Sequence, residues 1–137
     1  MIRLFFISLL VTVISTGIKF KIGQTYQGGK IFYIDKTGRH GLIAAPKDFP
    51  EMADWNKAMQ LCKNYRGGGY SNWHLPTKEE LNILYEQKDL IGGFAPSYYW
   101  SSTEADSKNA WYQVFFNGNQ YGSFKTYTGK VRAVRNF

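Results

Sequence analysis

Apolar residues recur at helical spacing in a first segment near the middle of the chain, residues 53–65. Asp54 lies at the position of an N-cap, and Arg66 with the three glycines of 67–69 ends the predicted helix. The spacings i, i+3, i+4 and i+7 place the apolar side chains on one helical face. That predicted stripe consists of Trp55, Ala58, Met59, Cys62 and, at its end, Tyr65.

A second helix is predicted over residues 78–87, after a strong start signal. Pro76 prevents a helix from continuing through this point, because its ring fixes φ and disfavours helical backbone before it. Thr77 is the predicted N-cap, and Glu80, three residues later, completes a capping box. The side chains expected to face the core are Leu81, Leu84 and Tyr85.

Segments rich in aromatic and β-branched residues flank the two helices and predict strands. These segments are 30–35, 42–45, 98–103, 110–116, 119–128 and 130–137. Asn117 and Gly118 predict a two-residue hairpin turn with positive φ at both positions. The order of elements predicts an α+β domain, with two helices packed on a mainly antiparallel sheet. In 110–116 both faces carry aromatic residues, so alternation leaves open which face is buried.

The start of the chain has the features of an export signal. Arg3 precedes an apolar run over 4–14, and small residues stand at the −3 and −1 positions of a cleavage site after residue 17. The run is too short to span a bilayer as a helix. The alternatives are a buried strand or an uncleaved anchor. We expect a signal peptide over 1–17 and an exported single domain over 18–137, secreted, periplasmic or cell-surface associated, with no membrane span after cleavage.

Charge and cysteine content narrow the choice of partners. The net charge of the 137 residues is +7, which favours acidic partners such as polyanionic glycans. Cys62 is the only cysteine, so no internal disulfide forms, and its position on the helical stripe predicts a buried thiol.

The last part of the chain combines basic and aromatic residues without any acid. Residues 107–137 contain five basic residues and no acidic one. In a strand over 119–128, alternation puts four residues on one face, namely Tyr121, Ser123, Lys125 and Tyr127. Tyrosine rings beside a lysine suit a sugar ring with a sulfate or carboxylate group, and the alternative is an ordinary solvated face. The candidate ligand-binding residues are Trp111, Tyr112, Tyr121, Lys125, Tyr127, Lys130 and Arg132.

The two arginines of the last predicted strand are expected to differ in role. Arg132 and Arg135 are three residues apart, so in a strand they point to opposite faces. Both cannot join one flat binding surface. We therefore expect one of them to be a structural hydrogen-bond donor.

No recognisable catalytic set is present in the sequence. The chain has one cysteine and two histidines, and Cys62 on a helix with His74 in a loop does not make a nucleophile–base pair. The histidines and carboxylates lack metal-ligand spacing, and the glycines of 67–69 lack the ending of a phosphate-binding loop. We expect a protein that is not an enzyme, without cofactor or metal. Nucleic acid suits a basic aromatic surface, but the export signal argues against it as a partner.

Several sequence blocks, in order, resemble the Lcl C-terminal domain family of bacterial exported proteins, long catalogued as a domain of unknown function. The blocks are GGKIFYID at 28–35, HGLIAAP at 40–46, Tyr65 with GGGY at 67–70, WHLPTKEEL at 73–81, YWSSTE at 99–104, AWYQ at 110–113 and VRAVR at 131–135. The resemblance covers about Gly23 to Phe137, nearly all of the predicted mature chain.

The resemblance implies a C-type-lectin-like fold. The member that gives the family its name is a collagen-like surface adhesin whose C-terminal domain binds sulfated glycosaminoglycans and trimerises. This chain has no collagen-like repeat, and it lacks the Glu-Pro-Asn, Gln-Pro-Asp and Trp-Asn-Asp triplets of calcium-dependent lectins. We expect a domain that binds acidic or sulfated glycans, with a homotrimer implied by the resemblance. The alternative is a structural or protein-interaction module of a surface assembly.

Overall fold

The structure, a computed structural model, describes residues 17–137. The predicted signal peptide, apart from Gly17, lies outside the described residues and stays a prediction. The helices are α1 (Trp55–Asn64), α2 (Lys78–Glu86) and α3 (Lys88–Ile91), with a 3-10 turn at Gly67–Gly69. The strands are β1 (Thr25–Tyr26), β2 (Gly29–Ile34), β3 (Gly41–Ala44), β4 (Tyr98–Glu104), β5 (Asn109–Val114), β6 (Gln120–Phe124) and β7 (Val134–Asn136).

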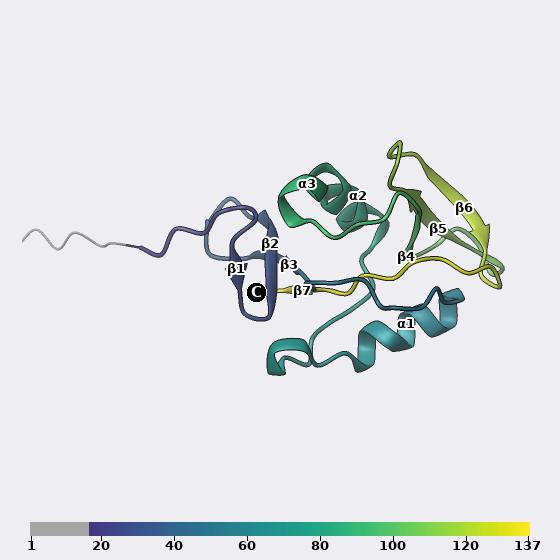
Figure 1. Ribbon diagram of the computed structural model, residues 1–137, viewed down its shortest axis with the longest axis horizontal. Helices are drawn as coiled ribbons and strands as arrows, with labels where there is room; N and C mark the ends of the chain where they lie inside the picture. Colours follow the sequence, from purple (N-terminus) through teal and green to yellow (C-terminus); the bar gives the residue numbers. More distant parts are fainter. Residues whose placement is uncertain (1–16) are drawn as a thin grey trace, which may run out of the picture.

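The strands form two antiparallel sheets, which confirms the predicted α+β class (Figure 1). The first sheet has the order β1-β2-β3-β7, so the last strand returns beside the N-terminal hairpin. The second sheet has the order β4-β5-β6. The segment before β7 links the sheets, since Lys130 N donates to the oxygen of Tyr98 while Ala133 O accepts from the nitrogen of Ala45. This crossing limits β7 to three residues, where the sequence predicted a strand over 130–137.

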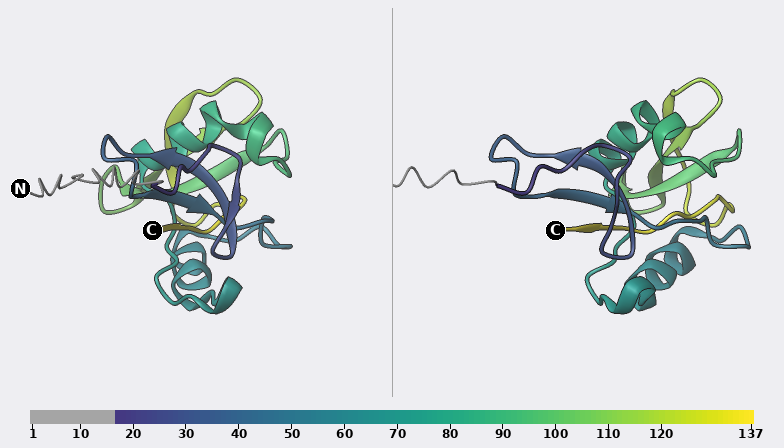
Figure 2. Two further views of the ribbon diagram at one scale, coloured as in Figure 1. Left: turned by 90° about the vertical axis from the view of Figure 1, so that its left-hand side faces the viewer. Right: turned by 60° about the vertical axis from the view of Figure 1, so that its left-hand side comes forward.

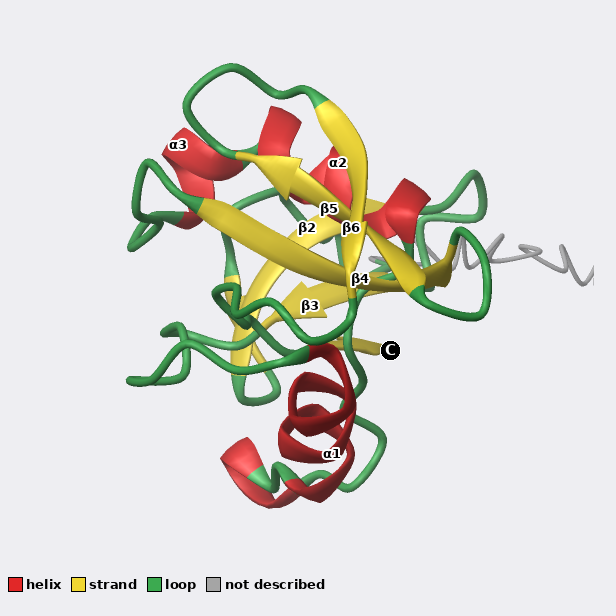
Figure 3. Ribbon diagram, turned by 90° about the vertical axis from the view of Figure 1, so that its right-hand side faces the viewer, coloured by secondary structure: helices red, strands yellow, loops and turns green. Residues whose placement is uncertain are grey.

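Helices α1 and α2 lie on opposite sides of the first sheet, as the views in Figures 2 and 3 show. Ile31 and Ile43 pair across β2 and β3 and belong to the core cluster that contains α1 residues. Phe32 and Leu42 belong to a second cluster with Leu81 and other residues of α2. Both faces of these strands are therefore buried, which explains their nearly continuous apolar sequence.

The predicted helix starts are confirmed. Thr77 Oγ1 accepts from the nitrogen of Glu80 at 3.1 Å, and Glu80 Oε1 accepts from the nitrogen of Thr77 at 2.9 Å, a complete capping box. Asp54 Oδ1 accepts from the nitrogen of Lys57 at 2.9 Å. Met59 is a correction to the predicted stripe, because α1 packs through a narrower face and leaves Met59 exposed.

Four local elements differ from their prediction. Strand β1 and helix α3 lie in segments where no element was predicted. The turn at Asn117 and Gly118 is wider than two residues, because the nitrogen of Val114 donates to the oxygen of Asn119. Of the two turn residues only Gly118 has positive φ, at 82°. Strand β6 ends at Phe124, because a turn follows in which the nitrogen of Tyr127 donates to the Phe124 oxygen.

Candidate functional site

Helix α2 covers one face of the β4-β5-β6 sheet, and the opposite face is only partly covered, since Trp100 and Ala110 there belong to the α1 core cluster. Gln113 is buried and its Nε2 donates to Asn82 Oδ1 of α2 at 3.0 Å. Trp111, on the same face of β5, lies beneath Lys78, whose Nζ is 3.5 Å from the ring centroid. Tyr112 points to the opposite face by strand alternation. The structure thus shows which face of β5 helix α2 covers, whereas both faces contain buried residues, Gln113 on one and Ala110 on the other.

The opposite face carries an aromatic pocket of about 550 Å³, between the sheet and the loop that follows β6. Strands β4, β5 and β6 supply its base, and the loop 126–129 forms its wall. We call this the aromatic pocket. Its lining residues are Tyr98, Trp100, Tyr112, Ser123, Thr126, Tyr127, Thr128 and Gly129.

Tyr112 is the centre of this aromatic arrangement. Its ring centroid lies 5.6 Å from that of Tyr98 at an interplanar angle of 85°, and 6.3 Å from that of Trp100 at 84°. On the other side Tyr121 lies 5.9 Å away at 41°. Both steep contacts are edge-to-face geometries, which aromatic pairs prefer. The rings therefore meet at near right angles, so the pocket has differently oriented aromatic walls.

The floor of the pocket is fixed by hydrogen bonds to a neighbouring segment. Trp100 is buried, and its Nε1 donates to the oxygen of Ala53 at 2.9 Å. Gly129 exchanges two backbone hydrogen bonds with Ala53 and lies against the indole. A Cβ on Gly129 would come within 3.0 Å of the Trp100 ring, so a larger residue there needs the indole to shift. These contacts fix the position of Trp100 relative to the loop 126–129 before any ligand binds.

The pocket is electrically neutral but rich in hydroxyl groups. None of its lining residues has an ionised side chain near neutral pH. Burial raises the pKa of Tyr112, and the adjacent phenols of Tyr98 and Tyr121 raise it further. Tyr112 therefore keeps its proton and remains a hydrogen-bond donor. Each lining hydroxyl of Ser, Thr or Tyr is both a donor and an acceptor.

Lys125 does not line this pocket, contrary to the sequence prediction. Its Nζ lies 2.7 Å from Glu104 Oε2 and 3.0 Å from the oxygen of Ser107. It also lies 4.5 Å from the ring centroid of Trp55. Because β6 ends at Phe124, the alternation that put Lys125 beside Tyr121 and Tyr127 does not continue. The lysine instead joins the β4–β5 hairpin to α1.

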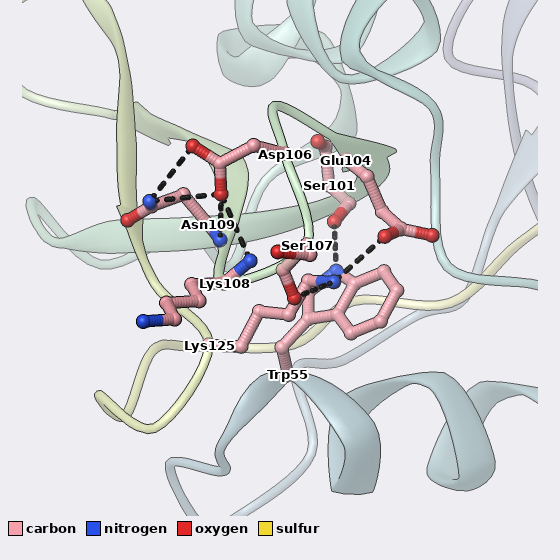
Figure 4. Close-up of polar contacts among 8 residues, drawn as sticks. All are labelled: Trp55, Ser101, Glu104, Asp106, Ser107, Lys108, Asn109 and Lys125. Atoms are coloured by element: carbon pink, nitrogen blue, oxygen red, sulfur yellow. Dashed lines mark hydrogen bonds and ion pairs between the residues drawn. The ribbon is translucent and has the colours of Figure 1, made fainter.

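The β4–β5 hairpin that receives Lys125 is built by Asp106. Asp106 Oδ1 accepts from the nitrogens of Lys108 and Asn109, both at 2.8 Å (Figure 4). These hydrogen bonds, with that of the Lys108 nitrogen as the largest contribution, lower the pKa of the Asp106 carboxyl. The two acidic groups of this hairpin, Glu104 and Asp106, are therefore engaged in local structure.

Arg132 is buried, so its prediction as a surface ligand residue is wrong. Its Nε lies 2.7 Å from Asp48 Oδ1, and one terminal nitrogen donates to the oxygen of Ala45 at 3.0 Å. The other terminal nitrogen donates to the oxygen of Gly93 at 2.9 Å. The guanidinium carbon also lies 4.1 Å from the ring centroid of Phe94. These contacts occupy the guanidinium and leave it no room for a ligand.

Arg135 is a second structural arginine, where the sequence predicted one. Its Nε donates to Asn72 Oδ1 at 2.8 Å, and a terminal nitrogen donates to the oxygen of Gln27 at 3.1 Å. Its guanidinium carbon lies 3.8 Å from the ring centroid of Tyr70. Both arginines of the VRAVR block thus hold distant segments together.

The structure therefore brings together only part of the predicted set. Tyr112 and Tyr127 line the aromatic pocket, and Tyr121 packs beside Tyr112. Trp111 lies on the face covered by α2. Lys130 is half-buried, its backbone forms a bridge with Tyr99, and it is not among the lining residues of the aromatic pocket.

Tyr98 and Trp100 are pocket residues that were not predicted. Their spacing of two in β4 was the available signal, because alternate residues of a strand share a face. Which face of β4 carries the pocket depended on the position of α2, which the sequence pattern does not give. Thr126 and Thr128 were predicted as part of a strand over 119–128, so no sequence signal indicated the loop that forms the pocket wall.

Other titratable groups do not form a site for chemistry in the described part of the chain. His74 Nε2 lies 3.0 Å from Glu80 Oε1, and Cys62 is fully buried in the α1 core. Among residues 17–137, no three His, Cys, Asp or Glu side chains gather to hold a metal ion. None of the helices formed by these residues is long and apolar enough to cross a membrane.

Comparison with known proteins gives one family and one structural match of interest. The family model described as Lcl C-terminal domain matches residues 33–135, which confirms the resemblance inferred from the sequence blocks. The chain is similar to the crystal structure of botrocetin, a C-type-lectin-like protein, at 14% sequence identity and a TM-score of 0.44. The match covers 83% of this chain and 93% of the botrocetin chain. At that TM-score the match carries no argument about function. Among curated proteins, the comparison found no match.

Proposed function

The chain belongs to the Lcl C-terminal domain family, and we propose that it is an exported, non-enzymatic binding domain that recognises an acidic or sulfated glycan at the cell surface or outside the cell. The aromatic pocket is the observation that carries this proposal. Its rings and hydroxyl groups match the two chemical features of a saccharide, an apolar C–H face and a rim of hydroxyls.

Exposed aromatic residues support a binding role for this face. Tyr98 is 46% exposed, Tyr121 46% and Tyr127 58%, although tyrosine usually packs its ring against the protein. Exposed tyrosines with an apolar face and a polar tip are typical of recognition surfaces. A folded domain without a ligand here has no stability reason to present three of them together.

The net charge of +7 supports an acidic partner. Arg132, Arg135 and Lys125 are occupied by internal contacts, so they do not supply this attraction. In the described chain, the ammonium groups of Lys108 and Lys130 have no hydrogen-bond or ion-pair partner. These two lysines are the cations of the acid-free segment that remain for a sulfate or carboxylate.

Heparin affinity chromatography and a glycan array test the proposal. We expect retention at low salt and steep loss of binding as salt rises, because exposed charges are screened within about 10 Å at 0.1 M salt. Tyr112→Ala should weaken array binding, whereas Tyr33→Ala, which removes an exposed tyrosine of the first sheet, should not. Absence of binding to every glycan would refute the proposal.

A protein-interaction module is the second candidate, and the free edge of β6 favours it. The sheet order leaves β6 outermost, and the ladder turns the backbone groups of Gln120 and Gly122 away from β5. Within residues 17–137 these groups have no backbone partner on the outer side. Uncharged open edges are sites of strand addition. A stable oligomer in sedimentation, with no glycan retention, would support this function, and the implied trimer would appear there.

A further inference from the structure

Given that the domain binds glycans, as proposed above, we infer that the aromatic pocket holds an uncharged pyranose residue, with no metal ion between protein and sugar. The acidic groups of the glycan then lie outside the pocket. Two kinds of recognition are thus separated in space. The pocket recognises the shape of the sugar ring and its hydroxyl groups. Lysines outside the pocket attract the acidic groups of the glycan.

The lining of the pocket argues against a charged group inside it. No lysine, arginine or histidine is among its lining residues. Lys125 is fixed to Glu104, and Lys130, whose backbone forms a bridge with Tyr99, is not among the lining residues. A sulfate or carboxylate in the pocket would lose water and gain no counter-charge, and uncompensated desolvation of an anion is costly. The same lining offers no carboxylate to pair with a cation.

The aromatic geometry suits one stacked sugar ring. The axial C–H groups of a pyranose carry a small positive charge, and they are attracted to the negative face of an aromatic ring. Tyr98 and Trp100 are nearly perpendicular to Tyr112, so a ring that stacks on one wall meets the edge of the next. The buried Trp100 forms the floor, and the exposed Tyr127 forms part of the outer wall.

The hydroxyl groups complete the match to a neutral sugar. Ser123, Thr126 and Thr128 lie around the same pocket, and each offers one donor and two acceptors. A sugar hydroxyl also donates and accepts, so it pairs with such groups without any fixed charge. A purely hydrocarbon ligand would leave these hydroxyls without partners, which costs free energy on binding.

Binding without a metal ion follows from the lack of any acidic residue in the pocket lining. Glu104 is paired with Lys125, and Asp106 accepts hydrogen bonds from the backbone and side chain of its own hairpin. Neither carboxylate lines the pocket. Calcium prefers six to eight oxygen ligands with several carboxylates, which the pocket lining does not offer.

The test uses matched glycans that differ only in sulfation. The probes are dextran with dextran sulfate, desulfated κ-carrageenan oligosaccharides with κ-carrageenan oligosaccharides, and an array of further neutral glycans. Tryptophan fluorescence reports occupancy, because Trp100 forms the floor of the pocket. We expect at least one neutral glycan to bind, unchanged by EDTA, and to change affinity less than about twofold between about 50 and 500 mM NaCl because no charge pair is involved.

Single variants distinguish the contribution of the aromatic pocket to binding from that of the charged residues outside it. Tyr112→Ala should weaken neutral-glycan binding by about tenfold, the loss of one good aromatic contact. Tyr127→Ala and Ser123→Ala, at exposed or half-buried positions, should also weaken it if Tyr112→Ala does not fold. Lys108→Gln should reduce binding of the sulfated members only, and Tyr33→Ala is the matched control.

The outcomes distinguish this inference from the proposed function. If only sulfated glycans bind, with steep salt dependence and no effect of the pocket variants, the inference is wrong and the proposed function stands. If neutral binding disappears with EDTA, the metal-free part of the inference is wrong. If no glycan of either kind binds, the proposed function itself is wrong. Neutral binding that depends on Tyr112 or Tyr127 supports the inference, and stronger, salt-sensitive binding of the sulfated members supports the proposed function.

Discussion

Arg132 Nε, in the crossing segment that links the two sheets, lies 2.7 Å from Asp48 Oδ1 in the loop after β3. Asp48 Oδ2 also accepts from the hydroxyl of Tyr99 at 2.6 Å. The guanidinium and the carboxylate thus join the loop after β3 to the strand of the second sheet that borders it. This relationship explains why a basic block in the sequence is part of the core.

Removal of one partner from this pair should be strongly destabilising. Arg132→Met leaves a largely buried carboxylate without its cation, and we expect the free energy of unfolding to fall by about 3–5 kcal/mol. Urea denaturation followed by circular dichroism measures the change. Lys108→Met, at an exposed position, should change it by less than about 0.5 kcal/mol. A loss below about 1 kcal/mol for Arg132→Met would contradict the structural role.

The His74–Glu80 pair should make stability depend on pH in the mildly acidic range. Burial alone would lower the pKa of His74, but the hydrogen bond and charge of Glu80 outweigh it and raise that pKa above 6.5. Burial alone would raise the pKa of Glu80, but its bonds to His74 and Thr77 lower that pKa below 4.5. The pair is therefore fully charged, and its contribution greatest, between pH 4.5 and 6.5.

His74→Gln tests this dependence. The contribution of His74 is lost as pH rises through its folded pKa, and that of Glu80 is lost as pH falls through its folded pKa. The variant should be less stable than the native chain by about 0.5–1 kcal/mol inside the window, since the pair is partly exposed, and the difference should shrink as pH rises above 6.5. Thermal unfolding at several pH values measures the difference. A constant difference at all pH values would exclude the ion pair, and His40→Gln is the control.

Lys125 should matter for stability more than for neutral-glycan binding. Lys125→Met keeps the aliphatic stem but removes the ion pair with Glu104 and the cation above Trp55, so we expect a loss of about 0.5–1.5 kcal/mol. Affinity for a neutral glycan should stay within about twofold, because the lysine does not line the pocket. Parallel denaturation and fluorescence titration measure both. A loss of affinity equal to that of Tyr112→Ala would place Lys125 at the ligand.

Cys62 should be unreactive in the folded protein. Burial raises the pKa of its thiol to about 12, and the side chain is fully buried against the first sheet. Since the thiolate is the reactive form, a thiol reagent at about pH 8 should modify the native protein only very slowly and the denatured protein at once. Rapid modification without denaturant would show that α1 opens readily. The absorbance of the chromophore that the thiol reagent releases on reaction measures the rate of Cys62 modification.

Local elements follow closely from the sequence because their causes are local. The capping box of Thr77 and Glu80 needs only three residues of separation, so its sequence signature was sufficient. The burial of Ala58 and Cys62 followed from helical spacing, and the pairing of β4 with β5 and of β5 with β6 agrees with the predicted strands. The family blocks also identified the family correctly.

Residues far apart in the sequence decided what alternation could not. Because helix α2 packs on one face of β5, it covers Trp111 and does not cover Tyr112. The turn after Phe124 moved Lys125 from the expected binding face to the β4–β5 hairpin. Periodicity assigns side chains to a face but does not say what packs against that face.

The sequence by itself determined the α+β class, the helix starts, the family and the aromatic character of the last third, because each depends on local spacing or composition. Only the tertiary structure decided which charges remained available. A lysine or arginine has the same formal charge in the sequence wherever it lies, but its contacts in the fold determine whether a ligand can reach it. Arg132 and Arg135 are buried by segments up to 108 residues away, and no local pattern predicts such contacts.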